Sequence, residues 1–357
     1  MLNNRHGGDI YQNIVSDDFS ANINPFGMSD RVKEVLRRSV DGWNCYPDPE
    51  CRELVQKLSV FHQVPAAAIC CGNGAADLIY RLVQITQPAR ALVLAPAFSE
   101  YEQALLSAGC EVEYFYLSAD RDFVPDWDGL LKRLSPRLDL LFFCNPNNPT
   151  GIPTVKEKMR ELAQACQDND ILLAVDECFC DFLDVPRHYS LLSDTGRYPR
   201  LLVLKAFTKT YAMAALRLGY GISMDIDLIK RLRLSGQPWS VSLPAQQAGA
   251  AALEEDSYIA RTIRLIAGQR ELLKQELMRL GYRVYDSQAN YIFFRDLGQE
   301  SGGRLWELLK AKGILIRDCS NYRGLTGGYY RIAVKTAPEN RHLIEALKDI
   351  HKTGDTI

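Results

Sequence analysis

The sequence predicts an α/β fold, with a mostly parallel central sheet flanked by helices and a smaller α+β domain after it. Two observations support this prediction. Short runs rich in Leu, Val and Ile alternate with helical stretches from about residue 90 to residue 222, as in parallel sheets that are buried on both faces. After Pro244, a long charged amphipathic stretch is followed by a few strands and one helix. This change of pattern indicates a second domain of about a hundred residues.

The composition is that of an ordinary globular protein. Of the 357 residues, 47% are hydrophobic and 24% are charged, and the formal net charge is −2. This charge gives no electrostatic footprint for nucleic acid, and no apolar run approaches the roughly 20 residues of a membrane span. The N-terminus lacks the apolar core of a signal peptide, so we expect a cytoplasmic protein. The ten cysteines lack metal-ligand spacing, which favours buried reduced thiols and no metal site.

The individual elements follow from apolar periodicity and from capping residues. The first 30 residues are too rich in Asn, Gly and Pro for a helix and are predicted to be irregular. Residues 1–40 are predicted to form an N-terminal arm and part of the small domain, 41–250 the large domain, and 251–357 the small domain. Helices are expected at 30–40, 51–62, after the Gly-Asn-Gly turn at 72–74, and at 155–169, 258–280 and 304–312. Strands are expected at 91–95, 112–117, 138–144, 171–175, 201–204, 218–222, 290–294, 314–317 and 329–334.

The stretch 201–222 carries the most suggestive chemistry. Lys209 follows a buried strand, stands next to the hydroxyl of Thr208, and precedes Arg217 by eight residues. This set suits a cofactor that has both an aldehyde and a phosphate. The lysine amine forms a Schiff base with the aldehyde, while the hydroxyl and the guanidinium hold the phosphate. Pyridoxal 5′-phosphate is such a cofactor. The alternative is that Lys209 and Arg217 are surface charges near a helix end.

Two turns upstream are candidates for holding such a cofactor. The string CGNGAADL places the free backbone N–H groups of Gly74, Ala75 and Ala76 at the start of a helix, which suits a phosphate. An ordinary tight turn explains it equally well. The string NPNNPTG follows a predicted strand, and its prolines and glycine fix a rigid loop. From this loop, Asn148 can donate a hydrogen bond to an oxygen on a bound ring.

Two more candidates stand at strand ends, where the ligands of parallel sheets bind. Asp176 follows the strand ILLAV, and a buried carboxylate there needs a partner. The pyridine nitrogen of the cofactor is such a partner, because a carboxylate keeps it protonated and makes the ring an electron sink. A helix N-cap or a structural salt bridge is the alternative. Phe98, in PAFSEY, can stack on the ring or belong to the core.

In this order along the chain, these strings resemble fold-type I pyridoxal-phosphate enzymes, and in particular class I/II aminotransferases of the histidinol-phosphate aminotransferase group. The resemblance runs from His6 to about Arg341. It implies that Lys209 is the Schiff-base lysine and that Tyr46, in YPDP, reaches the cofactor phosphate of a neighbouring subunit in a homodimer. The other implied roles are Asp176 at the pyridine nitrogen, Asn148 at the ring oxygen O3′, Phe98 stacked on the ring, and Thr208, Arg217 and the turn Gly74–Ala75–Ala76 at the phosphate.

Several further strings resemble the branch of that group that decarboxylates L-threonine O-3-phosphate. They are HGG, DFSANINPFG, DECFCDF, QPWSVS and ILIRDCSNY, the last one shortly before YYRIAV. The resemblance implies a small phosphorylated amino acid as substrate and a role in cobalamin side-chain synthesis. A disordered HGG and a surface Arg317 are the alternatives. The implied substrate-binding residues are His6, Asn22, Arg317 and Arg331, with Arg331 gripping the carboxylate.

This chain departs from the wider group at two places. Related aminotransferases usually have a tyrosine where this chain has Phe179, and that tyrosine bonds O3′, so its loss alters how the ring is held. The segment MAALRLGY replaces a stretch that commonly carries proline and glycine.

Two other functions stay open. One is transamination of histidinol phosphate or another amino acid with 2-oxoglutarate, since the same lysine, aspartate and arginine serve either reaction. The other is a non-catalytic regulator built on this fold, which would carry an additional DNA-binding domain.

Overall fold

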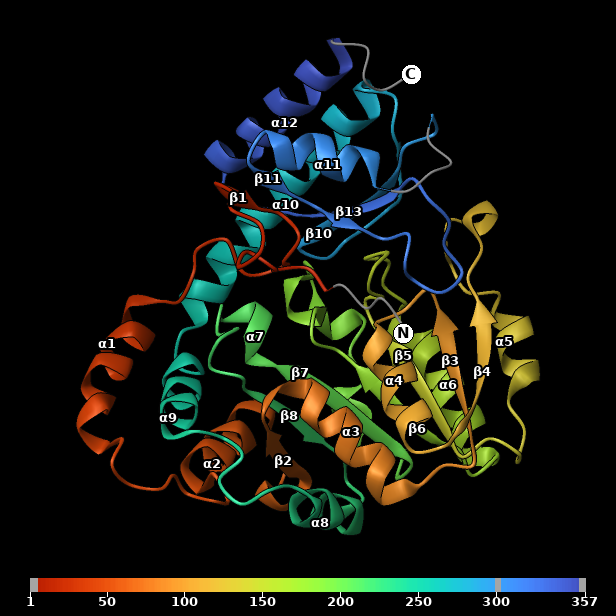
Figure 1. The fold of residues 1–357 in the computed structure, drawn as a ribbon. Helices are drawn as coiled ribbons and strands as arrows, with labels where there is room; N and C mark the ends of the chain where they lie inside the picture. Colours follow the sequence, from red (N-terminus) through yellow and green to blue (C-terminus); the bar gives the residue numbers. More distant parts are fainter. Residues whose placement is uncertain (1–5, 299–302, 353–357) are drawn as a thin grey trace.

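The computed structural model describes residues 6–298 and 303–352. These residues contain three sheets, of seven, four and two strands, and Figure 1 shows the four-stranded sheet lying above the seven-stranded one. Across this part of the chain, no helix has both the length and the apolar character needed to cross a membrane. The helices are α1 (Asp30–Ser39), α2 (Arg52–His62), α3 (Gly74–Thr86), α4 (Ser99–Ser107), α5 (Trp127–Arg133), α6 (Lys156–Asp168), α7 (Phe207–Thr210), α8 (Ile226–Ser235), α9 (Leu243–Ala252), α10 (Asp256–Arg279), α11 (Arg304–Ala311) and α12 (Ala337–Lys352).

The large sheet confirms the predicted α/β class. In the described residues it has seven strands in the order β2-β8-β7-β6-β5-β3-β4. The run from β7 to β4 is parallel, and β8 is antiparallel to both of its neighbours. The strands are β2 (Ile69–Gly72), β3 (Arg90–Ala95), β4 (Glu111–Tyr116), β5 (Leu140–Cys144), β6 (Leu172–Asp176), β7 (Leu201–Ala206) and β8 (Gly219–Ile222).

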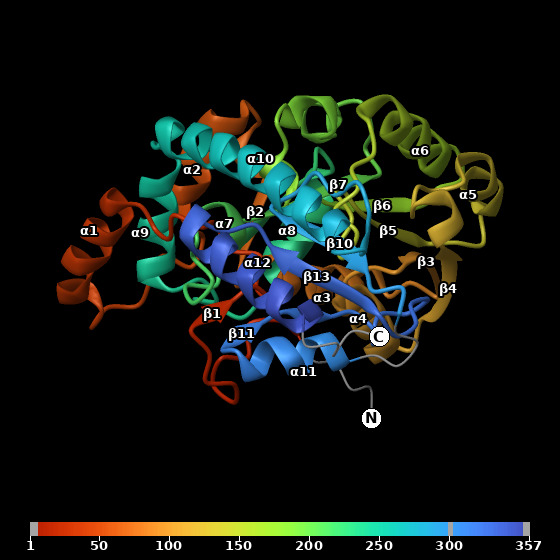
Figure 2. The same ribbon diagram turned by 90° about the horizontal axis from the view of Figure 1, so that it is seen from above.

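Both faces of β3, β5, β6 and β7 are buried, which explains why these strands read as largely apolar runs, whereas the edge strand β4 is partly exposed. Alternate side chains point to opposite faces of a strand. Leu140 and Leu172 therefore pack with α3, α4 and α8, while Leu141 and Leu173 pack with α5 and α6 on the other face. Figure 2 shows α3 and α4 on one side of the strands and α5 and α6 on the other.

The small sheet is antiparallel, in the order β12-β13-β10-β9 within the described residues. The predicted single strand at 314–317 is wrong, because the chain changes partners within it. Its first half pairs with the N-terminal segment and its second half pairs with β13. The strands are β1 (Asp17–Asp18), β9 (Arg283–Val284), β10 (Tyr291–Arg295), β11 (Ile314–Leu315), β12 (Arg317–Asp318) and β13 (Tyr329–Ala333).

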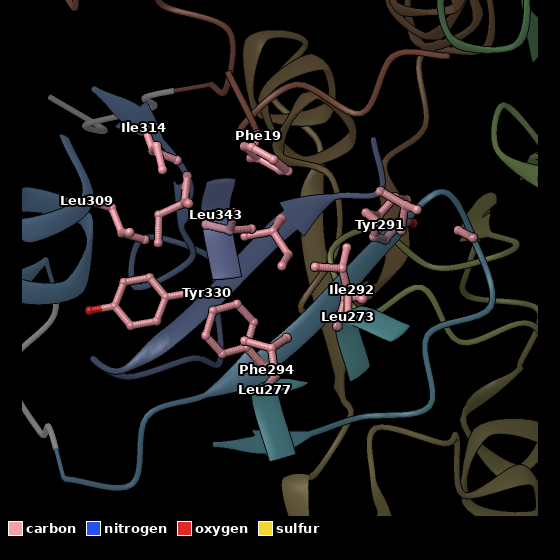
Figure 3. Close-up of a cluster of buried hydrophobic side chains, with 14 of the residues drawn as sticks. Phe19, Leu273, Leu277, Tyr291, Ile292, Phe294, Leu309, Ile314, Tyr330 and Leu343 are labelled. Carbon is pink, nitrogen blue, oxygen red and sulfur yellow. The ribbon is translucent and has the colours of Figure 1, made fainter. Parts of the chain in front are cut away.

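The N-terminal segment packs against the C-terminal part of the chain. The region predicted to be irregular contains β1, which pairs in parallel with β11. Phe19 is fully buried in a core shared with α10, α11, β10, β13 and α12, and Figure 3 shows its ring beside Leu343 and Ile314. This packing holds the segment that contains His6 and Asn22 against the strands that contain Arg317 and Arg331. The division into domains at residues 40 and 250 stays a proposal.

Candidate active site

A cavity of about 400 Å³ opens where the strands β5, β6 and β7 end, at Cys144, Asp176 and Ala206. This volume is typical of a site for a small ligand. Most of the residues singled out in the sequence line this one cavity, although they come from positions far apart in the chain. They are His6, Asn22, Ala75, Ala76, Phe98, Asn148, Asp176, Thr208, Lys209, Arg217, Arg317 and Arg331.

Lys209 stands in the cavity on the single-turn helix α7, directly after β7. Burial, reinforced by the positive charges of Arg331 and Arg217, lowers the pKa of Lys209 to about 8. A lysine with a depressed pKa has more of the free amine that attacks an aldehyde. Lys205, four residues earlier, differs in environment, because its Nζ lies 2.6 Å from Asp181 Oδ1. Although burial opposes the charged form, Asp181 holds the pKa of Lys205 well above its ordinary value.

Asp176 ends β6 and is almost fully buried at the cavity. Two donors satisfy its carboxylate. The Tyr101 hydroxyl donates to Oδ2 at 2.6 Å, and the backbone N–H of Cys178 donates to Oδ1 at 2.9 Å. Burial and the charge on Asp176 raise the pKa of Tyr101 well above its ordinary value, so this hydroxyl stays a donor. Among the ion pairs of residues 6–298 and 303–352, none involves Asp176, so the structural salt bridge considered above is not formed there.

The start of α3 forms a cradle with Arg217. The helix has no side-chain cap at its N-terminus, so its first N–H groups are available to an anion. Gly74 has φ +83°, and a Cβ added there would lie 2.7 Å from Arg217 Nη2. The guanidinium therefore lies against the first turn of the helix, although Gly74 itself does not line the cavity. Arg217 also has a positive φ of 56°, which is unusual for a side chain of its size.

Asn148 and Arg331 contact each other on the far side of the cavity. Arg331 Nη1 donates to Asn148 Oδ1, and Nη2 donates to the backbone oxygen of Ser20 at 2.8 Å. Because Asn148 Oδ1 accepts from the guanidinium, the amide nitrogen is the part of this side chain suited to donate to a ligand. The Tyr322 hydroxyl lies 3.5 Å from Asn148 Oδ1 and 3.5 Å from Arg331 Nη1.

The arginines of the cavity are not neutralised by carboxylates. In the described residues, no Asp or Glu forms an ion pair with Arg217, Arg317 or Arg331. Arg331 is 5% exposed and its Nε has no hydrogen-bond partner there. Arg317 donates to Asn321 Oδ1 at 2.7 Å and stacks on the Tyr322 ring at 5.1 Å. Buried cations without anionic partners are costly, so the cavity is suited to anions.

The remaining predicted residues differ in placement. His6 is half exposed at the cavity, with Nε2 2.9 Å from Glu100 Oε1. Asn22 is buried, and its Oδ1 has no partner in the described residues. Tyr46 does not line the cavity of its own chain. It is 79% exposed and stacks on Trp239, with 4.3 Å between the ring centroids.

The lining residues that were not predicted from the sequence include Glu100, Tyr101 and Tyr322. Glu100 and Tyr101 lie in the first turn of α4, two and three residues after Phe98. For Tyr101 the usable signal was its spacing from Phe98, because residues at i and i+3 share one face of a helical turn. Phe179 lines the cavity as well and makes an edge contact with Tyr291 at 5.0 Å.

Comparison with known proteins agrees with this geometry. The family model described as "Aminotransferase class I and II" matches residues 17–347. The chain is 36% identical to the threonine-phosphate decarboxylase of Salmonella typhimurium, over 98% of this chain and 97% of that protein. It is 32% identical to the histidinol-phosphate aminotransferase of Methanosarcina mazei, over 92% of this chain and 86% of that protein.

A solved structure gives the same result in three dimensions. The crystal structure of L-threonine-O-3-phosphate decarboxylase from Porphyromonas gingivalis superimposes with a TM-score of 0.82 at 26% identity, over 94% of this chain and 99% of that one. The family match spans nearly the whole chain, and the expected fold-type I architecture is confirmed. The chain therefore belongs to the class I and II aminotransferases, a family of enzymes whose usual cofactor is pyridoxal 5′-phosphate.

Proposed function

We propose that this chain uses pyridoxal 5′-phosphate to decarboxylate L-threonine O-3-phosphate to (R)-1-amino-2-propanol O-2-phosphate, a step that feeds cobalamin side-chain synthesis. One observation carries the proposal. The cavity that holds Lys209 also holds Arg217, Arg317 and Arg331, and no carboxylate of the described residues pairs with them. Three arginines match three anionic groups, namely the cofactor phosphate, the substrate phosphate and the substrate carboxylate.

The residues present fit the cofactor. The cradle of Arg217 and α3, where a Cβ at Gly74 would collide, suits its phosphate together with Thr208. Asp176 stands at the sheet edge with an oxygen able to accept from the pyridine nitrogen. Asn148 offers a donor for the ring oxygen O3′, and Phe98 a face for stacking. When bound, this cofactor supplies an electron sink for the electron pair left at the substrate Cα.

The chain's own groups then have distinct tasks. Asp176, held by Tyr101 and the Cys178 N–H, would accept a hydrogen bond from the ring nitrogen. Arg331 binds the substrate carboxylate, and Arg317, His6 and Asn22 surround its phosphate. The cofactor would accept electrons from the Cα bond perpendicular to its ring plane, because only that bond overlaps the π system. By holding the carboxylate, Arg331 would place the Cα–carboxylate bond there; that bond would break, CO₂ would leave, and Lys209 would deliver a proton to Cα.

Transamination is the second candidate, and the likeness to the Methanosarcina mazei histidinol-phosphate aminotransferase favours it. The two reactions differ in what they consume. Histidinol phosphate has no carboxylate to lose, and its amino group needs a keto acid as acceptor. A decarboxylase releases one CO₂ for each threonine phosphate without any keto acid.

The test uses purified holoprotein with O-phospho-L-threonine and no keto acid. We expect CO₂ and the amino alcohol phosphate in equal amounts, with little turnover of L-threonine, which lacks the phosphate. In a parallel assay with 2-oxoglutarate added, formation of glutamate without CO₂ would establish transamination instead. Lys209→Ala removes the nucleophile and should abolish the visible absorbance of the bound cofactor. Lys205→Arg, which keeps the charge beside Asp181, is the matched control and should retain the absorbance.

We also propose that the chain acts as a cytoplasmic homodimer in which Tyr46 completes the phosphate site of the partner. Its exposure of 79%, outside the cavity of its own chain, supports this role. Subunit mixing tests it at limiting cofactor. Tyr46→Phe and Lys209→Ala chains, exchanged with each other, should regain activity, since one site of the mixed dimer then has both wild-type residues. If Tyr46 acts within its own chain, mixing restores nothing.

A further inference from the structure

Glu100 is an acidic side chain in a cavity otherwise suited to anions. It lines the same cavity as Arg217, Arg317 and Arg331, and its side chain is only 15% exposed. A carboxylate in this position repels a phosphate unless its charge is compensated. The hydrogen bond from His6 lowers the pKa of Glu100, with burial acting against it. The side chain is therefore an anion and not a proton donor at neutral pH.

Both oxygens of Glu100 have partners. Oε1 lies 2.9 Å from His6 Nε2, and the Tyr80 hydroxyl donates to Oε2 at 3.0 Å. Glu100 lies in the first turn of α4, two residues after Phe98, whose ring centroid is 5.9 Å from that of His6. These contacts fix the imidazole at the mouth of the cavity, although half of its surface is exposed.

The direction of the hydrogen bond between His6 and Glu100 determines which ring nitrogen of His6 is available to a ligand. Because Nε2–H donates to Glu100, the other ring nitrogen, Nδ1, remains for a ligand. In a neutral imidazole that nitrogen has a lone pair and repels a phosphate, whereas in the imidazolium it is a donor. His6 also lines two further cavities. The charged side chains of those cavities include both signs: Asp9, Glu102, Glu307, Lys310, Arg317, Asp318 and Arg323.

We propose that Glu100 is a positioning residue that orients His6, so that Nδ1 of His6 binds the phosphate of the substrate. This inference rests on the proposed function, because it assigns the recognition of the phosphorylated substrate. Glu100, which was not predicted from the sequence, thereby positions the half-exposed His6 as a ligand for a phosphate. Tyr80 occupies the second oxygen and keeps the carboxylate from turning toward the arginines.

The experiment measures binding without turnover. The probes are 1-amino-2-propanol phosphate, which has no carboxylate to lose, and 1-amino-2-propanol, which lacks the phosphate. Each is titrated into the holoprotein and followed by calorimetry and by the absorbance of the cofactor. We expect Glu100→Gln to weaken binding of the phosphorylated probe roughly tenfold, as for loss of a charge-assisted hydrogen bond. Binding of the phosphate-free probe should change less than about twofold.

A double-mutant cycle separates a role through His6 from a general effect of charge. His6→Ala should weaken binding of the phosphorylated probe as Glu100→Gln does. The double variant should bind this probe no more weakly than His6→Ala alone. Glu100→Asp should recover part of the affinity. Glu102→Gln is the matched control, because Glu102 lies on the same turn and pairs with Arg323 instead. It should leave the preference for phosphate intact.

The outcomes distinguish this inference from the proposed function. If the wild-type holoprotein binds both probes equally, the phosphorylated substrate class is wrong. If it prefers the phosphorylated probe and Glu100→Gln keeps that preference, the role of Glu100 is wrong. The role of Glu100 would also be overturned by an equal loss of affinity for the phosphorylated probe in Glu102→Gln, or by additive losses of affinity in the double variant. Cofactor absorbance and circular dichroism of each variant verify that the site is intact.

Discussion

The depressed pKa of Lys209 predicts a pH dependence that separates it from the other lysines. With a pKa of about 8, roughly one tenth of this side chain is free amine at pH 7. An ordinary lysine with a pKa of 10.5 is only about 0.03% free amine at that pH. The difference in reactive form is about 300-fold. A less basic amine is intrinsically less nucleophilic, which removes part of this gain without moving the pH of half-maximal reaction.

The assay labels the apoprotein briefly with formaldehyde and a mild borohydride reagent at a series of pH values, and mass spectrometry quantifies each lysine. Labelling of Lys209 should be half-maximal near pH 8 and level off above about pH 9. Lys205 is the internal control, since its ion pair with Asp181 and its burial keep it unreactive over the same range. The exposed lysines provide the reference for ordinary behaviour.

Arg331 supplies a second arm of the same experiment. After burial, its positive charge is the largest cause of the lowered pKa of Lys209. Arg331→Gln should therefore move the half-maximal pH of labelling upward, because it removes a like charge. A wild-type midpoint near pH 10, or a midpoint that does not move in the variant, would refute the electrostatic account of the site.

Three further predictions follow from contacts of the described residues. Tyr101→Phe removes the donor to Asp176 but keeps the ring, so the apoprotein should lose about 2 kcal/mol in free energy of unfolding, measured by urea denaturation. Gly74→Ala places a Cβ at φ +83° and 2.7 Å from Arg217 Nη2, so cofactor affinity should fall about tenfold, measured by fluorescence titration. Burial lowers the pKa of His62 to about 4, so the folded state resists its protonation. Stability should fall as pH drops from about 6.5 to about 4, by about 2 kcal/mol after allowance for partial exposure, and His62→Phe should abolish this slope.

The residues proposed to contact the cofactor ring were predictable because they follow recognisable strands. Asp176 comes directly after an unbroken apolar run, and Asn148 and Phe98 come shortly after two others. The carboxyl ends of parallel strands meet at one edge of a sheet, so sequence position alone implied that these side chains gather. The cavity at the ends of β5, β6 and β7 has them together.

Other features depend on partners that no local pattern reveals. Tyr101 donates to a carboxylate 75 positions away, and it is one of 17 tyrosines in the sequence. The stretch 314–317 reads as one apolar strand, but β11 pairs with β1 and β12 pairs with β13. A two-residue acidic strand such as Asp17–Asp18 has no periodicity to detect, because it forms only through its partner.

The difference between residues that a local pattern predicts and residues that distant partners place bears on which reaction the site catalyses. The groups that suit the cofactor stand on one sheet, whereas His6, Asn22, Arg317 and Arg331 come from the two ends of the chain. The pairing of β1 with β11 joins these ends, and the bond from Arg331 Nη2 to Ser20 O spans 311 positions. The substrate-side groups are thus fixed relative to one another before they meet the cofactor. Since decarboxylation and transamination require different Cα bonds to stand perpendicular to the ring, we propose that this long-range pairing decides between them.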